Sequence, residues 1–237
     1  MTHPINLTDG KADAKWYWRR GFTEGAYYIL LNPNLINGWQ NPVLMKPLII
    51  YAHPDVAGHC SLIRDEVLSQ LGEKKIAYDF VDLYKEQFDP VLHENELYTA
   101  GNRDVSPQAK RYQELIAGTD KIIFIYPVWW NSTPAILKGF FDKVLTSGFA
   151  FKFRKSGIPV AFLTGKKAAL FVTSGSPTLF YKLFLGDRGV KVVARDTLGF
   201  CGIKAREFHV GSARKVKKSH NEQSRGMAAK GLRYLRL

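Results

Sequence analysis

From Pro47 onward, short apolar runs alternate with longer amphipathic stretches. This alternation is typical of a parallel sheet covered by helices, because each pair of parallel strands needs a crossover connection. We predict strands at residues 48–52, 76–83, 121–126, 168–173 and 192–200, with helices near residues 61–71, 106–117, 134–145 and 179–190. An alternation of this length indicates one doubly wound α/β domain over residues 47–237, ending in a basic helix.

Residues 1–46 differ from this pattern. They are rich in aromatic side chains, among them Trp16, Trp18 and Trp39, and are interrupted by turn-forming Asn, Pro and Gly. We interpret them as an N-terminal extension that wraps over its own domain or over a dimer partner. An arm that docks to another protein or to a membrane surface is the alternative, since Trp and Tyr also favour interfaces.

The net charge of +13 suggests an anionic partner, but much of the excess lies in the last thirty or so residues. We interpret this charge as the solvated face of a terminal helix and predict no nucleic-acid partner. Steering of a nicotinamide cofactor or contact with an anionic membrane surface remain as alternatives. The two cysteines, Cys60 and Cys201, are far apart. They indicate neither a disulfide framework nor a metal site, and they fit a reducing cytoplasm.

Ligands of an open parallel sheet bind at the carboxyl ends of its strands, so the segments that follow the strands carry the functional prediction. The first segment, residues 53–61, is a polar, glycine-containing loop that leads into a helix. The unpaired backbone N–H groups of that helix would suit a phosphate, and His53, His59 and Ser61 could add donors. An ordinary turn with a serine cap explains the same residues equally well.

Two further segments follow the third and fourth strands. In residues 127–134, Trp129 and Trp130 are adjacent and lie between two prolines, so they cannot both point into one core layer. One of them would offer a stacking surface to a flat aromatic ligand. The third segment, residues 173–177, is small and polar and can bring N–H and hydroxyl donors close to a ligand.

These segments, together with residues 134–145 and 149–151, resemble the NAD(P)H:quinone oxidoreductases of the DT-diaphorase type. That family also includes quinone-reductase-like ancillary subunits of bacterial potassium-efflux systems. The resemblance spans residues 47–209 and is most specific in residues 127–151. It implies a flavodoxin-like three-layer α/β/α fold with a five-stranded parallel sheet in the order 2-1-3-4-5. It also implies a homodimer that binds FMN or FAD and passes a hydride from NAD(P)H to a quinone-like acceptor.

The resemblance assigns roles by position. The flavin phosphate would contact His53, with His59 nearby, and the helix start at Ser61. The flavin ring would lie against Pro127, Val128, Trp129 and Trp130, and its pyrimidine edge against Thr173, Ser174, Gly175 and Ser176. The implied catalytic residues are Tyr181 beside the flavin and Phe151 and Phe153 as an aromatic lid lent by the partner subunit.

This sequence departs from the family at several positions. Gly58 and Ser61 stand where many relatives have Ser and Asn, and the lid residues are Phe where the diaphorases have Tyr. The histidine that follows the matching tyrosine in the diaphorases is missing, because residues 184–187 read Phe-Leu-Gly-Asp. A Tyr–His proton relay is therefore not predicted.

The predicted function is flavin-dependent NAD(P)H:quinone reduction by a ping-pong cycle, in which the donor and then the acceptor occupy one slot. The alternative is a flavin-binding regulatory subunit that docks to a membrane transporter or another partner. A one-electron carrier is disfavoured, because such carriers are usually acidic.

Overall fold

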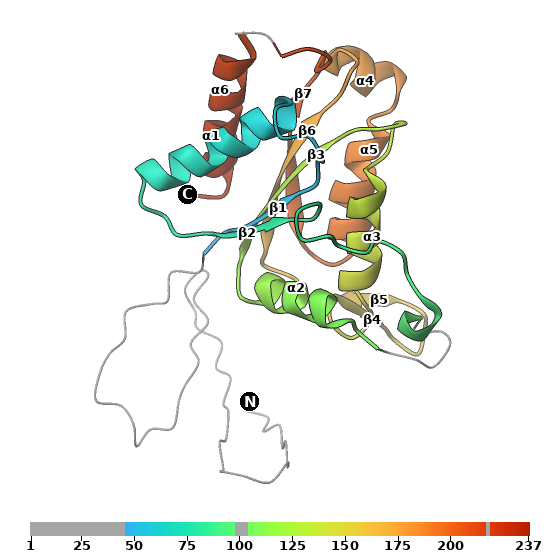
Figure 1. Cartoon of the computed structure of the whole chain (residues 1–237). Coiled ribbons are helices and arrows are strands. Elements are labelled where there is room, and N and C mark those ends of the chain that lie inside the picture. The colour runs from blue at the N-terminus through green and yellow to red at the C-terminus, as the bar shows by residue number, and fades with distance from the viewer. Residues whose placement is uncertain (1–45, 98–103, 217–218) are drawn as a thin grey trace, which may run out of the picture. The chain divides into compact units, whose positions relative to one another are not determined.

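The computed structural model describes residues 46–97, 104–216 and 219–237, which belong to one compact unit, Met45–Leu237. The predicted N-terminal extension lies outside the described residues except for Lys46. The sheet at the centre of the unit is parallel, and its strands appear in the order β2-β1-β3-β6-β7 (Figure 1). This is the predicted order 2-1-3-4-5, so the flavodoxin-like fold is confirmed.

The strands are buried on both faces, as expected for a parallel sheet between two helical layers. Burial is complete or nearly so along the middle of the sheet. The strand bounds are β1 Leu48–Tyr51, β2 Asp79–Asp82, β3 Lys121–Pro127, β6 Lys167–Thr173 and β7 Lys204–Val210. All four pairings are parallel and in continuous register, which brings the carboxyl ends of β1, β3, β6 and β7 to one edge of the sheet.

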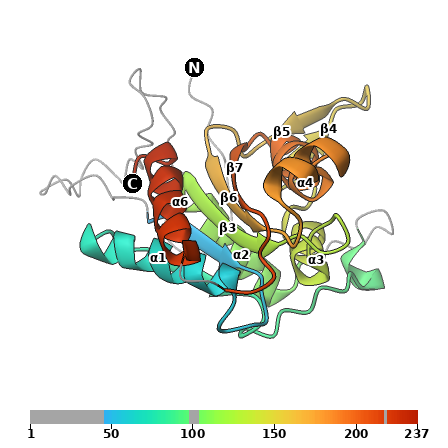
Figure 2. The same ribbon diagram turned by 90° about the horizontal axis from the view of Figure 1, so that it is seen from above.

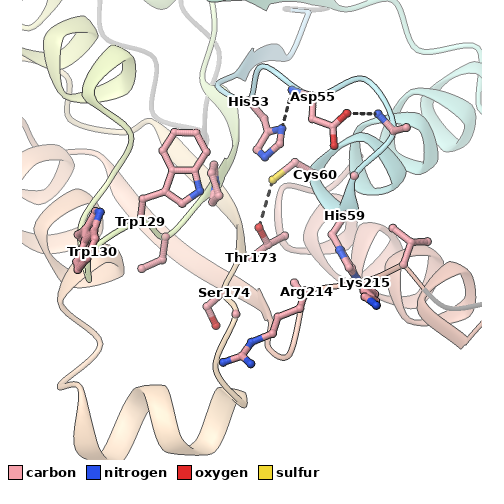
Figure 3. A pocket seen from close by; sticks show the side chains of 17 residues that line it. His53, Asp55, His59, Cys60, Trp129, Trp130, Thr173, Ser174, Arg214 and Lys215 are labelled. Atoms are coloured by element: carbon pink, nitrogen blue, oxygen red, sulfur yellow. Dashed lines mark hydrogen bonds between the residues drawn. The ribbon is translucent and has the colours of Figure 1, made fainter.

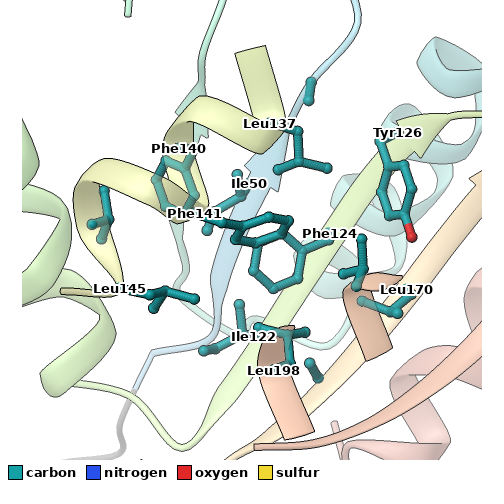
Figure 4. Packing of buried hydrophobic residues seen from close by; sticks show 14 of the residues in the cluster. Ile50, Ile122, Phe124, Tyr126, Leu137, Phe140, Phe141, Leu145, Leu170 and Leu198 are labelled. Carbon is teal, nitrogen blue, oxygen red and sulfur yellow. The ribbon is translucent and has the colours of Figure 1, made fainter. Parts of the chain in front are cut away.

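Helices cover both faces of the sheet. One face is covered by α1 (His59–Glu73) and α6 (Ser219–Tyr234), which pack side by side (Figure 2). The other face carries α2 (Pro107–Ala117), α3 (Ala135–Val144), α4 (Thr178–Phe184) and α5 (Arg188–Lys191). Phe124 of the sheet packs against Phe141 of α3 with ring centroids 5.6 Å apart, within a cluster that also holds Phe140 and Leu137 (Figure 4). Within the described residues, no helix has the length and apolar character needed to cross a membrane.

The prediction of a strand at residues 192–200 is wrong. These residues continue α5 as a wider helical segment, Val192–Gly199, of the π type. Val193 and Leu198 are buried while Arg195 and Asp196 between them are exposed, which is a helical rather than a strand pattern. The fifth strand is instead Lys204–Val210, an edge strand whose polar residues hide its period-two burial.

The predicted helix at residues 179–190 is interrupted. It is divided into α4 and α5 by a break at which Gly186 and Asp187 both adopt positive φ, 71° and 57°. Glycine reaches this left-handed region without strain, and Asp is among the few other residues that tolerate it. The break turns the chain so that α5 packs behind the loop after β3.

A small antiparallel hairpin follows α3. It consists of β4 (Phe151–Phe153) and β5 (Pro159–Ala161). The hairpin lies beside the segment that precedes β7, because Phe151 packs edge-on against Phe200 with centroids 4.9 Å apart. It therefore lies at the amino edge of the sheet, away from α4 at the carboxyl edge (Figure 1).

Candidate functional site

A cleft of about 780 Å³ opens at the carboxyl edge of the sheet (Figure 3). Four loops line it, one after each of β1, β3, β6 and β7. Its lining consists of His53, Asp55, Ala57, Gly58, His59, Cys60, Pro127, Val128, Trp129, Trp130, Thr173, Ser174, Gly175, Ala213, Arg214, Lys215 and Val216. Nine of the eleven predicted cofactor-binding residues thus line this cleft, and the other two, Ser61 and Ser176, do not.

The loop after β1 is ordered by its own side chains. The backbone N–H of Asp55 donates to Nδ1 of His53 (3.0 Å), and the N–H of Ala57 donates to the Asp55 carboxylate (3.0 Å). Because Nδ1 of His53 accepts, the ring carries its proton on Nε2. The following helix, α1, begins after Gly58 without a side-chain cap. Its first N–H groups therefore remain available to an anion.

His59 lines the cleft at the start of α1 and is 7% exposed. Its Nε2 lies 3.0 Å from Nδ1 of His220 in α6, so the two rings share a hydrogen bond. Burial lowers the pKa of His59, and the neighbouring charge of His220 lowers it further. The pair joins α1 to α6 beside the cleft.

Ser61 does not line the cleft. Its hydroxyl donates to the carbonyl of Asp55 (2.9 Å) and lies 3.1 Å from the hydroxyl of Tyr51. Both side chains are buried, and burial raises the pKa of Tyr51 to about 12. Ser61 therefore braces the loop from behind and has no hydroxyl hydrogen left for a ligand.

We call residues 128–133 the tryptophan turn. Trp129 and Ser132 exchange two backbone hydrogen bonds, N–H of Trp129 to O of Ser132 (3.0 Å) and N–H of Ser132 to O of Trp129 (2.9 Å). Between them Trp130 and Asn131 have φ of 51° and 57°, as in a tight hairpin turn of type I′. A bulky residue such as Trp is rare in this region of φ, so Trp130 holds backbone strain at the rim of the cleft.

The two tryptophans are placed differently. The ring of Trp129 lies 5.8 Å from the ring of His53 and forms an aromatic wall with it. Trp130 is fully exposed and points away from the interior (Figure 3). Val128, which precedes them, donates its N–H to the carbonyl of Thr173 (2.7 Å), so the turn is tied to the next strand.

We call residues 173–176 the serine loop. Ser174 is 5% exposed, and its N–H donates to Val210 (2.9 Å) while its carbonyl accepts from Ala213 (2.8 Å). Its hydroxyl donates to the carbonyl of Ser176 (2.9 Å) and also contacts Nε2 of His209 (2.8 Å). Within the described parts of the chain, the N–H groups of Gly175 and Ser176 have no hydrogen-bond partner. Of these two residues only Gly175 lines the cleft, so the loop offers the cleft one backbone donor.

The floor of the cleft joins α1 to β6 through a thiol. Sγ of Cys60 lies 3.3 Å from Oγ1 of Thr173. Burial raises the pKa of Cys60 to about 12, against a smaller lowering by Thr173. The sulfur is thus a neutral packing group rather than a nucleophile.

Sequence reasoning missed the loop after β7. Arg214 and Lys215 line the cleft opposite the tryptophan turn (Figure 3). The sequence pattern predicted Lys215 on the solvated face of a terminal helix, because the fifth strand was expected too early in the chain. With β7 at Lys204–Val210, the rule that ligands bind beyond the carboxyl ends of strands points directly to residues 211–216.

The three predicted catalytic residues do not line the cleft of their own chain. Tyr181 is fully buried in α4, where its hydroxyl accepts the N–H of Gly189 (2.9 Å). Phe151 and Phe153 lie on the hairpin at the amino edge of the sheet, in contact with Phe200. In the described ranges, no group of three or more His, Cys, Asp or Glu side chains could hold a metal ion.

Comparison with known proteins gives consistent results. A family model described as a flavodoxin-like fold matches residues 45–235. The chain is 36% identical over 170 residues to an uncharacterized NAD(P)H oxidoreductase of Haemophilus influenzae, covering 70% of this chain and 83% of that protein. It is 30% identical over 213 residues to ribosyldihydronicotinamide dehydrogenase (quinone) of Pongo abelii, covering 78% and 87%.

Among solved structures, the chain is similar to Smu.1420 of Streptococcus mutans UA159. The TM-score is 0.70 and the sequence identity 31%, with 79% of this chain and 98% of that chain covered. The family model begins at residue 45 and so leaves residues 1–44 outside it.

Proposed function

The chain belongs to the flavodoxin-like NAD(P)H:quinone oxidoreductase family and is an oxidoreductase, and on that premise we propose that it reduces quinones or similar flat acceptors through a bound flavin. The observation that carries the proposal is the convergence of the β1, β3, β6 and β7 loops on one cleft. The cleft combines an aromatic wall, free backbone donors and a basic corner within about 780 Å³. That volume is in the usual range for a cofactor site.

The aromatic wall fits a flat ring. Trp129 is 40% exposed and lies beside His53, and Pro127 and Val128 continue the surface toward the sheet. A planar ligand would gain stacking and the exclusion of water from these side chains. The wall is supported from behind by α5, because a Cβ built on Gly189 would lie 3.2 Å from Val128.

The opposite corner fits a phosphate. The uncapped start of α1 offers backbone N–H groups, and His59, Arg214 and Lys215 surround it with donors and positive charge. Helix dipole and cations act together on an anion in such a place. We therefore assign the flavin phosphate to this corner, with His53 between it and the aromatic wall.

The serine loop fits the polar edge of the ring. The N–H group of Gly175, which lines the cleft, is free to donate to it, while side-chain hydrogen bonds of Thr173 and Ser174 hold the loop. Donors fixed in advance stabilise negative charge without having to reorient. The bound flavin supplies the hydride chemistry, and the protein supplies binding, orientation and electrostatics.

We propose a ping-pong order, because one cleft serves both the NAD(P)H donor and the acceptor. The apolar surface of Trp129 selects flat partners, which both the nicotinamide ring and a quinone are. The oxidised donor must then leave the cleft before the acceptor can enter it.

We also propose a homodimer. Phe151 and Phe153 could reach a cleft only from a second copy, since they lie at the amino edge of their own sheet. Phe153 is 44% exposed, which leaves part of its ring available for such a contact. Sedimentation analysis of wild-type protein should give twice the mass of one chain, and a monomer at the assay concentration would contradict this part.

Anaerobic addition of NADH or NADPH to the flavin-loaded protein tests the main proposal. The yellow absorption band should bleach within one turnover time and return when a quinone is added. If the flavin stays oxidised with both donors, the reductase function is wrong. Mass spectrometry of the released cofactor distinguishes FMN from FAD.

A chain lacking residues 1–40 tests the regulatory alternative. A reductase should keep most of its NAD(P)H oxidation after this deletion. A docking subunit should keep the flavin but lose its partner. The names of the relatives favour the enzyme, and no described residue favours the docking role.

A further inference from the structure

His209 lies on β7, at the carboxyl end of the edge strand, and its ring is directly behind the serine loop. It approaches two residues named above. Its Nε2 lies 2.8 Å from the hydroxyl of Ser174, and its ring stands edge-on to Tyr181 with centroids 5.0 Å apart. The sequence pattern offered no histidine partner in the stretch after Tyr181, and the fold supplies one from another strand.

The hydrogen bonds determine which ring nitrogen carries the proton. The hydroxyl of Ser174 has a single hydrogen, which it donates to the carbonyl of Ser176 (2.9 Å). The bond with His209 must then be donated by Nε2–H of the ring. The other nitrogen, Nδ1, is buried and has no hydrogen-bond partner among the residues that the structure describes. A buried lone pair without a partner is less costly than a buried N–H, so both arguments give the same tautomer.

The surroundings keep this ring neutral. The pKa of His209 is lowered to about 4, chiefly by burial, with Glu207 on the same strand opposing the shift and Lys182 on α4 adding to it. Glu207 is itself paired with Lys182, which limits its influence on the ring. At neutral pH His209 is therefore an uncharged donor with one available N–H.

We propose that His209, as the neutral Nε2–H tautomer, is a positioning residue that holds Ser174 and so keeps the N–H group of Gly175, which lines the cleft, free to bind the electron-rich edge of a flavin. The inference rests on the proposed function for the identity of the ligand. It adds a residue outside the cleft lining to the machinery of the site.

The route from His209 to the Gly175 donor is short. Ser174 anchors the carbonyl of Ser176 through its hydroxyl, and Ser212 anchors the same carbonyl through its N–H (2.9 Å). With this carbonyl held from two sides, the peptide groups before it cannot rotate freely. Loss of the His209 bond would leave the Ser174 hydroxyl free to rotate and would loosen one of these two anchors.

The consequence concerns charge on the ligand. A reduced flavin carries more negative charge at its pyrimidine edge than an oxidised one, so fixed N–H donors favour the reduced form. We expect a variant without the His209 donor to bind reduced flavin about tenfold more weakly relative to oxidised flavin. For a two-electron couple a factor of ten corresponds to about 30 mV. The reduction potential of the bound flavin should become more negative by about that amount.

The first measurement needs no cofactor. In nitrogen-15 NMR of histidine-labelled, flavin-free protein at pH 7, the ring signals that disappear in His209→Gln should be those of a neutral Nε2–H tautomer. If that ring is protonated on Nδ1, or on both nitrogens, the proposal is overturned. This result does not depend on whether the protein is a reductase.

The second measurement is the reduction potential of the flavin-loaded protein in a matched series. His209→Leu removes the donor, Ser174→Ala removes its acceptor without changing the core, and both should shift the potential alike. His209→Gln keeps an N–H donor and should recover part of the shift. His93→Leu is the control, because His93 is exposed and paired with Asp89 outside the cleft.

The outcomes are distinct. If Ser174→Ala keeps the wild-type potential, the positioning role is wrong even where His209→Leu fails to fold. If wild-type protein binds no flavin, the proposed function is wrong. The tautomer of His209 is still decided by the NMR measurement, which uses flavin-free protein.

Discussion

The tryptophan turn and the serine loop face the same cleft but are held in different ways. The turn closes on itself through two backbone hydrogen bonds between Trp129 and Ser132, and its most prominent side chain, Trp130, is fully exposed. The serine loop is held by partners far along the chain, with His209, Val210 and Ala213 bonded to Ser174. The turn presents a surface to a ligand and the loop presents a backbone donor. Shape in one wall is therefore encoded locally, and polarity in the other depends on a distant strand.

A substitution at Gly189 tests whether the tryptophan turn also depends on packing against α5, in addition to its own backbone hydrogen bonds. A Cβ at this position would lie 3.0 Å from the Tyr181 hydroxyl, 3.2 Å from Val128 and 3.3 Å from the backbone of Ser132. We expect Gly189→Val to lower the free energy of unfolding by about 1 to 3 kcal/mol through overpacking. Urea denaturation measures the change. Gly226→Val on α6, where a Cβ meets nothing within 4 Å, is the matched control and should change stability little.

Trp129 tests the claim that the turn contributes surface rather than stability. We expect Trp129→Ala to weaken flavin binding roughly tenfold, because an aromatic stacking contact is worth about 0.5 to 1.5 kcal/mol beyond its buried area. The free energy of unfolding should change by less than about 0.5 kcal/mol, as for other partly exposed side chains. Fluorescence titration and urea denaturation give the two values. Phe184→Ala, on an exposed residue outside the cleft lining, should leave flavin affinity intact.

The pH dependence of stability tests whether His209, the distant partner of the serine loop, is buried as a neutral ring. The pKa of His209 is about 4 in the folded protein and near 6.5 when the ring is free in water. Between these values the unfolded chain binds a proton that the folded chain does not, so stability falls as pH decreases from about 6.5 to about 4. We expect His209→Gln to flatten this part of the stability curve, as measured by thermal unfolding across the window. An unchanged slope would show that the ring is not buried in the neutral form.

The smallest expected change in the free energy of unfolding comes from replacing Trp130, which tests for backbone strain within the turn. Its φ of 51° disfavours a bulky side chain, and its full exposure means that replacing it loses no packing. Asn tolerates this region of φ and is favoured in turns of this type. We expect Trp130→Asn to raise the free energy of unfolding by roughly 0.5 kcal/mol. Trp130→Phe keeps the strain and should give no gain, and equal stability of the two variants would contradict the explanation.

Sequence alone determined the α/β architecture and three of the four cleft loops with their neighbouring residues, while the order of the strands came from the family resemblance. The architecture and the loops follow from local patterns, since apolar runs of strand length and the residues directly after them can be read without knowing what packs against what. The tryptophan turn belongs to this group, because Trp129 and Trp130 directly follow a strong central strand.

Only the tertiary structure decided the position of the fifth strand and everything that depends on it. Lys204–Val210 is an edge strand with exposed polar residues, so its pattern is weaker than that of the helical residues 192–200 before it. Arg214 and Lys215 were missed with it, and so was His209. The physical reason is that an edge strand is stabilised by pairing with its neighbour, here β6, and such pairing leaves little trace in its own composition.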